Sequence, residues 1–92
     1  MPQIMRLNRD YVENYGIAVT TPNQGVRVNG ELAMVVGGHV TPHHPPDLLD
    51  SPVPMVQGSP SVFFERIPVC RIGDRAQCGH PAVAGSPDTF AN

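Results

Sequence analysis

The sequence predicts a small all-β domain that is built from repeated short strands and stabilised by one bound metal ion. Eleven Pro and nine Gly in 92 residues interrupt any helical period, because proline inside a helix costs about 3 kcal/mol. Three Phe, two Tyr and no Trp provide little large apolar surface. A core of this kind hardly offsets the conformational entropy of folding, so an additional cross-link is expected.

The strands are expected where short apolar runs lie between turn residues. They are residues 16–20, 25–28, 31–36, 54–56, 61–65 and 68–72. A helix has room only near Asn8–Tyr15, for one or two turns. Residues 42–54 contain five prolines and are predicted to be an ordered polar loop, with a mobile linker as the alternative.

Two reversals of the chain occupy corresponding places. Asn29-Gly30 stands between apolar runs and predicts a two-residue hairpin, because both residues tolerate the positive φ of a type I′ turn. Glu65-Arg66 holds the same place further along. Neither residue favours that turn, so a looser reversal is expected there.

An internal repeat organises the chain. A constant offset of 36 residues places Val26 on Val62, Gly37 on Gly73 and His44 on His80. A second relation joins residues 58–60 to residues 85–87, both Gly-Ser-Pro. The 92 residues are therefore interpreted as one domain with two and a half copies of a unit that buries its apolar face against its neighbours. Its parts are an N-terminal segment (1–15), a first repeat with a His-rich loop (16–53), and a second repeat with a partial third (54–92).

Charge and hydropathy exclude several classes of protein. The formal net charge is −2 and the six basic residues, all Arg, are scattered, so nucleic-acid binding is not expected. The longest apolar run, residues 32–36, is too short to span a membrane. The N-terminus lacks the pattern of a signal peptide, and synthesis in the cytoplasm is expected.

Histidine and cysteine are concentrated in two loops that follow corresponding strand ends. The candidate metal ligands are His39, His43, His44, Cys78 and His80. Three imidazoles and one thiolate would form a closed tetrahedral zinc site, the kind that stabilises structure and leaves no position for catalysis. Four of the five are expected to bind. His43 and His44 are alternatives, because adjacent side chains of an extended chain point in opposite directions. The register of the repeat favours His44 as the ligand, whereas a tighter turn after Pro42 would favour His43. The competing interpretation is a solvated surface loop beside a buried thiol.

The second cysteine and a nearby carboxylate are assigned structural roles. Cys70 aligns with Met34 and is expected to be a small buried hydrophobe. Asp74 aligns with Gly38 and is expected to cap or orient a loop. A disulfide between Cys70 and Cys78 would close a short loop and stabilise little, so metal is favoured over a disulfide. No catalytic residue is expected.

Residues 58–92, GSPSVFFERIPVCRIGDRAQCGHPAVAGSPDTFAN, resemble the repeat of the PAAR family. In that repeat a GSPxVF strand leads to a P-A-A-R-like segment, then to GD, a cysteine loop and another GS. Here Pro68-Val69-Cys70-Arg71 occupies the positions that name the family. Residues 26–38 are similar but degenerate, with Leu32 for the proline, Val35 for the arginine and Gly38 for the aspartate.

The resemblance implies a small cone of short β-hairpins with pseudo-threefold internal repeats and a structural zinc ion, held by three His and one Cys, near the apex. Members sharpen trimeric β-helical spikes of the VgrG type in type VI secretion, or the spikes of contractile phage tails. Cys78 matches the family's cysteine after GD and residues 39–44 match a ligand loop, whereas His80 departs from the commoner pattern.

The function expected from this resemblance is a non-enzymatic tip for membrane piercing, carried in a virion tail or a secreted spike complex. We expect one tip per spike trimer, a monomer in isolation, and neither nucleic-acid binding nor stable membrane anchoring. The alternatives are a zinc-dependent adaptor and a small zinc hydrolase. The hydrolase would need an open coordination position and a carboxylate base.

Overall fold

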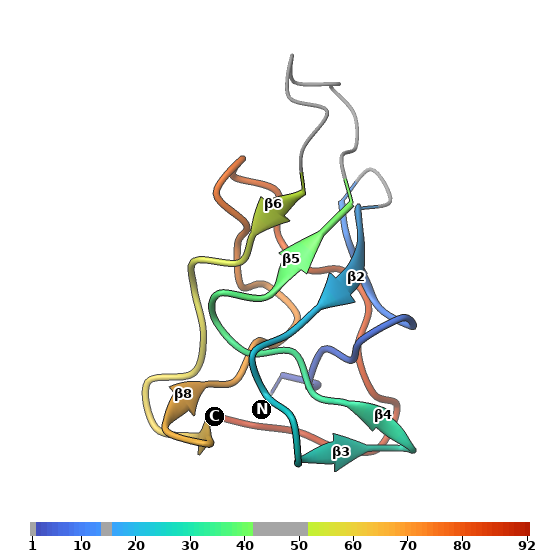
Figure 1. Ribbon diagram of the computed structural model, residues 1–92, viewed down its shortest axis with the longest axis vertical. Helices are drawn as coiled ribbons and strands as arrows, with labels where there is room; N and C mark the ends of the chain where they lie inside the picture. Colours follow the sequence, from blue (N-terminus) through green and yellow to red (C-terminus); the bar gives the residue numbers. More distant parts are fainter. Residues whose placement is uncertain (1, 14–15, 42–51) are drawn as a thin grey trace.

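The computed structural model describes residues 2–13, 16–41 and 52–92, and within them it contains eight short strands and no helix. The strands are β1 (Tyr11–Val12), β2 (Gly16–Thr20), β3 (Arg27–Val28), β4 (Glu31–Leu32), β5 (His39–Val40), β6 (Val53–Pro54), β7 (Phe63–Phe64) and β8 (Ile67–Pro68) (Figure 1). The all-β prediction is confirmed. Residues 8–13, where a helix had room, form a turn and β1. In the described part of the chain no helix could cross a membrane.

The strands form one four-stranded sheet and two separate hairpins. The sheet has the order β1-β2-β5-β6 with antiparallel neighbours, and the hairpins are β3–β4 and β7–β8. Figure 1 shows both hairpins and both chain ends at the lower end of the molecule, below β2, β5 and β6. We call this lower end the base and the opposite end the apex.

Several strands differ from the sequence prediction. β2 has the predicted bounds, but β5 was not predicted, because its two residues are strand only through their pairing with β2 and β6. The strands predicted at 31–36 and 68–72 are shorter, since β4 and β8 each end after two residues. Beyond that point the chain changes partner: Ala33 pairs with Arg6, and Val35 with Val69.

The reversal at Glu65-Arg66 is not loose, and this expectation was wrong. Phe64 pairs with Ile67, which leaves the same two-residue turn as in the β3–β4 hairpin. Glu65 and Arg66 both have positive φ (53° and 69°), as do Asn29 and Gly30. Local preference disfavours this conformation, so contacts with the rest of the chain must hold it.

A closed ring of backbone hydrogen bonds lies in the core. The Met5 amide donates to the Cys70 carbonyl (2.9 Å), Cys70 donates to Met34 (2.8 Å), and Met34 donates to Met5 (2.9 Å). All three residues are fully buried. Cys70 is thus the small buried hydrophobe that the alignment with Met34 predicted, and burial raises the pKa of its thiol far above the ordinary value.

Buried side chains form two clusters. The larger holds the ring residues and the apolar side chains of the sheet: Met5, Val12, Ala18, Met34, Val40, Val53, Met55, Cys70, Ala76 and Ala82. The smaller fills the base between the hairpins and the termini: Ile4, Val28, Ala33, Val69 and Ala91.

The two termini pair with each other at the base. Gln3 bridges Phe90, the Ile4 amide donates to the Thr89 carbonyl (2.9 Å), and the Ala91 amide donates to the Pro2 carbonyl (2.9 Å). The N-terminal segment therefore contributes to both apolar clusters, a role that the sequence did not indicate.

Candidate functional site

Cys78 and His80 lie on a tight loop at the apex, residues 75–81. The loop is closed by a bridge between Arg75 and Pro81 and by a hydrogen bond from the Ala76 amide to the His80 carbonyl (3.0 Å). Gly79 between the two candidate ligands has φ 94°, a conformation that favours glycine. The Arg75 guanidinium donates to the Gly79 carbonyl (2.6 Å) and braces the turn.

The thiol and the imidazole face each other. Cys78 Sγ lies 3.5 Å from His80 Nδ1. Two ligands of a tetrahedral zinc ion, at about 2.3 Å for sulfur and about 2.05 Å for nitrogen, are separated by about 3.6 Å. The pair therefore has the spacing of one edge of such a site, and its donor set of sulfur and nitrogen is of the kind that zinc prefers.

His39 is not brought to this pair. It lies on β5, where its Nδ1 is 3.1 Å from Thr20 Oγ1 and its amide donates to the same oxygen (3.2 Å). Across residues 2–13, 16–41 and 52–92, no three His, Cys, Asp or Glu side chains are grouped as a metal site. His43 and His44 fall outside the described residues.

The strands that flank residues 42–51 end beside the cysteine loop. The Gln77 amide donates to the Pro54 carbonyl on β6 (2.9 Å), and β6 pairs with β5 through Val40 and Val53. Figure 1 shows the loop 75–81 at the apex, on the same side as the adjoining ends of β5 and β6. The chain thus leaves β5 and enters β6 at the end of the molecule where Cys78 and His80 lie.

Asp74 orients the start of this loop, as the sequence predicted. Its Oδ2 accepts from the Arg71 amide (2.8 Å) and from Arg71 Nε (2.9 Å), and Oδ1 accepts from Nη2 (2.9 Å). The same arrangement, missed by the sequence analysis, joins Arg6 to Asp10. In both pairs the hydrogen bond to the carboxylate raises the pKa of the guanidinium. Both carboxylates are buried and engaged, which suits bracing rather than proton transfer.

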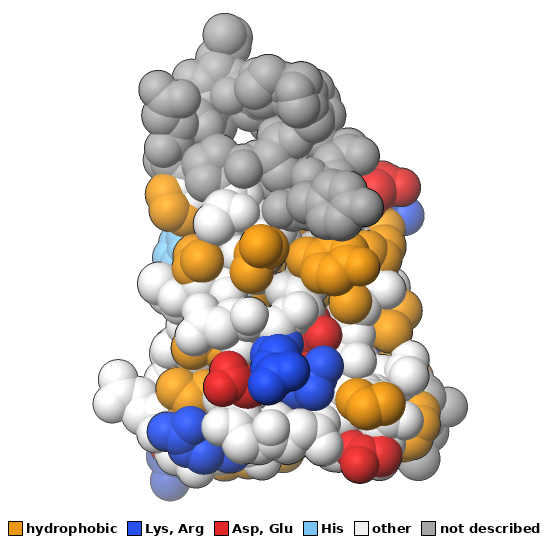
Figure 2. Space-filling model, turned by 90° about the vertical axis from the view of Figure 1, so that its right-hand side faces the viewer, with side chains coloured by type: hydrophobic (Ala, Val, Ile, Leu, Met, Phe, Trp, Pro, Cys, Tyr) orange, Lys and Arg blue, Asp and Glu red, His pale blue; other side chains and the backbone are white. Residues whose placement is uncertain are grey.

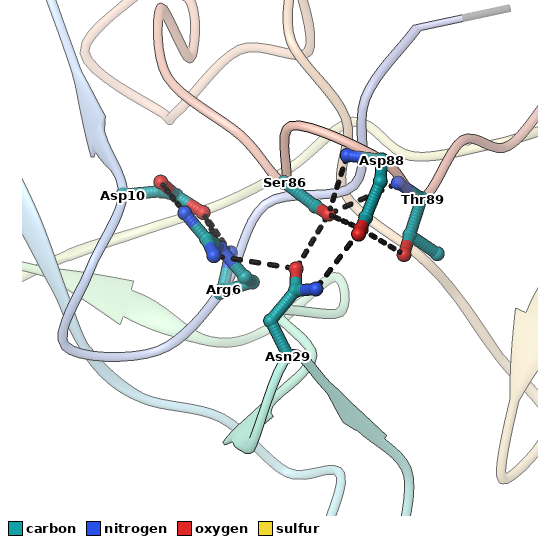
Figure 3. Close-up of polar contacts among 6 residues, drawn as sticks. All are labelled: Arg6, Asp10, Asn29, Ser86, Asp88 and Thr89. Atoms are coloured by element: carbon teal, nitrogen blue, oxygen red, sulfur yellow. Dashed lines mark hydrogen bonds and ion pairs between the residues drawn. The ribbon is translucent and has the colours of Figure 1, made fainter.

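A second polar network, also missed, ties the β3–β4 turn to the C-terminal segment. Asn29 Oδ1 accepts from Ser86 Oγ (2.5 Å) and from Arg6 Nη1 (3.3 Å), while Asn29 Nδ2 donates to Asp88 Oδ1 (2.9 Å) (Figure 3). Hydrogen bonds that the Asp88 carboxylate accepts from Asn29, Ser86 and Thr89, led by the one from Asn29, lower the pKa of its carboxyl. In the sequence, the repeated Gly-Ser-Pro segments at residues 58–60 and 85–87 were the signal that could have identified Ser86 as a structural residue.

Exposed apolar side chains occur at two levels of the molecule. Phe63 and Phe90, on the base segments, are 51% and 45% exposed. Higher up, Ile17, Val19, Val56 and Val83 are exposed. Figure 2 shows one face, on which hydrophobic side chains gather above a group of charged ones. The described surface therefore offers apolar contact area at the base as well as on the flanks.

Comparison with known proteins points to one family. The sequence profile of the PAAR motif matches residues 13–89 of the 92-residue chain. No curated protein sequence matches the chain significantly. The matched residues include β2, β5 and β6 of the sheet, both hairpins and the cysteine loop.

Proposed function

The chain belongs to the PAAR family, whose members are spike-tip proteins of contractile injection systems, and on that premise we propose that it caps and sharpens one trimeric β-helical spike for membrane piercing. The family is structural and not known as enzymatic, and PAAR proteins bind spikes of the VgrG type as part of secretion or phage spike complexes. The observation that carries the proposal is the closed ring of hydrogen bonds among Met5, Met34 and Cys70. Three chain segments joined in this way would let a single chain present three similar faces about one axis.

Recurring contacts around the ring support a pseudo-threefold arrangement. The same backbone hydrogen bond, 2.9–3.1 Å long, occurs three times just outside the ring, always from the residue that precedes a ring residue. The donor and acceptor pairs are Ile4 to Thr89, Ala33 to Val26 and Val69 to Val62. We infer three units, of which the third is completed by the N-terminal segment rather than left as a half.

Side chains and backbone angles repeat in the same register. Asn23, Ser59 and Ser86 are buried, and each accepts hydrogen bonds from the amides two and three residues later. Three residues past each ring residue the backbone is left-handed, at Asn8, Gly37 and Gly73. Agreement among such unlike features favours three copies of one unit over a coincidence of turns.

We propose that one zinc ion staples the apex, with Cys78 and His80 as two ligands and residues 42–51, which include His43 and His44, as the source of others. Support comes from the 3.5 Å separation of the thiol and the imidazole and from the position of β5 and β6 beside their loop. His39 is a weaker candidate, since it is bound to Thr20. Structural zinc supplies about 10–16 kcal/mol of apparent binding energy in small domains, which stiffens a tip whose apolar core is small.

The base is the face proposed to meet the spike. Its two hairpins and its paired termini carry strand edges that would otherwise be prone to self-association. Three similar units in one chain match the three chains of a spike end without a trimer of tips. The proposed stoichiometry is therefore one tip to three spike chains, with a monomeric tip in isolation.

Native mass spectrometry of the tip alone and mixed with a recombinant VgrG-type spike trimer tests this function. The expected species are a monomer of the tip and a complex of three spike chains with one tip. Three tips per spike trimer, or a stable homotrimer of tips, would contradict the pseudo-threefold argument. Absence of any complex would refute the capping function itself.

A further inference from the structure

The two turns at the base differ in chemistry although they share one conformation. Asn29 and Gly30 adopt positive φ readily, and the same conformation at Glu65 and Arg66 is strained, because a Cβ crowds the backbone there. Strain of this kind persists only where other contacts or a function require it.

Contacts within the chain explain Glu65. Its Oε1 accepts a hydrogen bond from the Gln24 amide (2.7 Å). Its other oxygen, Oε2, would lie only 3.2 Å from a Cβ at position 25, so Gly25 leaves the room that the carboxylate needs. The Glu65 carboxylate thus fastens the β7–β8 turn to the neighbouring segment.

No contact of this kind explains Arg66. Its side chain is exposed and makes no hydrogen bond or ion pair with the described residues. The corresponding turn position in the β3–β4 hairpin is Gly30, which would satisfy the backbone without strain. The guanidinium of Arg66 therefore serves no purpose visible inside the protein.

The same hairpin also carries an exposed aromatic ring. Phe63, on β7, is 51% exposed. In the β3–β4 hairpin the corresponding residue is Arg27, whose guanidinium is bound to the Gly30 carbonyl (3.1 Å). Arginine and aromatic residues are the types that dominate binding energy at protein interfaces. Among the described hairpins, β7–β8 alone presents an aromatic ring and an unpaired cation together.

We propose that the β7–β8 hairpin is the anchor of the tip on the spike, a proposal that rests on the proposed function. Phe63 makes an apolar contact with the spike, and Arg66 pairs with a carboxylate on the end of one spike chain. A partner that covers the guanidinium removes its hydration, and without an opposite charge nothing would offset the lost hydration free energy. The partner must therefore offer an anion. On a spike of three identical chains the tip's single Arg66 can form this ion pair only once.

Two matched substitutions test the anchor. Arg66→Gln removes the charge at the turn, and Arg9→Gln removes the charge of another exposed arginine that has no partner among the described residues. Affinity is measured against a recombinant VgrG-type spike trimer at low salt. Arg66→Gln is expected to weaken binding about tenfold, and Arg9→Gln to leave it within about twofold. The difference should shrink at high salt, where a single pair at an interface edge is screened.

A third variant separates binding from folding. Arg66→Gly suits the left-handed turn, so its melting temperature should equal or exceed that of the wild type while its affinity falls like that of Arg66→Gln. Wild-type affinity in both Arg66 variants would overturn the anchor and leave the capping function standing. No binding by the wild-type protein would refute the capping function and the anchor with it.

Discussion

The two cysteines provide the sharpest test of the metal proposal, because they are matched in chemistry and opposite in environment. Cys70 is fully buried in the hydrogen-bonded ring, and its Sγ lies 3.5 Å from the Gln57 carbonyl oxygen. Cys78 is partly buried and faces His80. Cys70→Ala and Cys78→Ser should therefore respond differently to the removal of metal.

The expected magnitudes follow from these environments. Cys70→Ala removes one buried atom and leaves a small cavity, which costs about 1–2 kcal/mol whether or not metal is present. Cys78→Ser removes a thiolate ligand from the proposed site. A metal held at about 1,000 times its dissociation constant contributes about 4 kcal/mol to stability, and most of this should be lost. For a domain of this size 1 kcal/mol shifts the melting temperature by about 4–8 °C.

Thermal unfolding of the wild type and both variants, with excess zinc and with a chelator, distinguishes the two roles. The wild type and Cys70→Ala should both lose stability when the chelator is added, and Cys78→Ser should be almost insensitive to it. A chelator effect of equal size in all three proteins would refute the assignment of Cys78 as a ligand. No chelator effect in the wild type would refute the structural metal.

Three further outcomes are expected. Elemental analysis of the purified protein should find about one zinc per chain, and well under half an equivalent of any transition metal would contradict the site. Gly38→Ala should destabilise the fold by about 1–3 kcal/mol, because the new Cβ would lie 2.7 Å from the Thr20 carbonyl oxygen. The control variant Gly30→Ala places its Cβ where no atom lies within 4 Å, so it should cost only its backbone strain, about 1 kcal/mol. Equal losses of stability in denaturant titrations would show that the close approach at Gly38 is not real. The folded state lowers the pKa of Asp88 from its ordinary value of 3.8, so the contribution of Asp88 to stability is complete above pH 3.8 and is lost as pH falls through the lower folded value. Asn29→Ala should raise the pKa of Asp88 toward the ordinary value in an NMR titration. An unchanged pKa would show that the hydrogen bond from Asn29 is not the main cause of the shift.

Local chemistry alone was enough to predict the features that depend on neighbouring residues. Proline and glycine content excluded long helices, and the described residues contain none. Asn29-Gly30 forms the expected two-residue turn. The motif of residues 58–92 was sufficient to identify the family, and the profile match confirms it.

Features that depend on distant contacts were missed or predicted wrongly. Glu65-Arg66 adopts a turn that its own residues disfavour, because Glu65 is fastened to Gln24 from across the base. The pairing of Arg6 with Asp10 was missed. These two residues are four positions apart, whereas Arg71 and Asp74 are three positions apart, so the two pairs do not align in the sequence.

The sequence by itself determined the strand-rich composition, the turn at Asn29-Gly30, the burial of Cys70 and the family, because each depends on residue types and on spacing along the chain. The tertiary structure alone decided that residues 2–5 complete the base and the ring with Cys70 and that β5 is a strand. It also decided that His39 is bound to Thr20 and that, among the described residues, it does not join Cys78 and His80 in a metal-binding group. The physical reason is that these elements are two to five residues long. Strands so short have no stability of their own and exist only where a partner from another part of the chain satisfies their backbone hydrogen bonds.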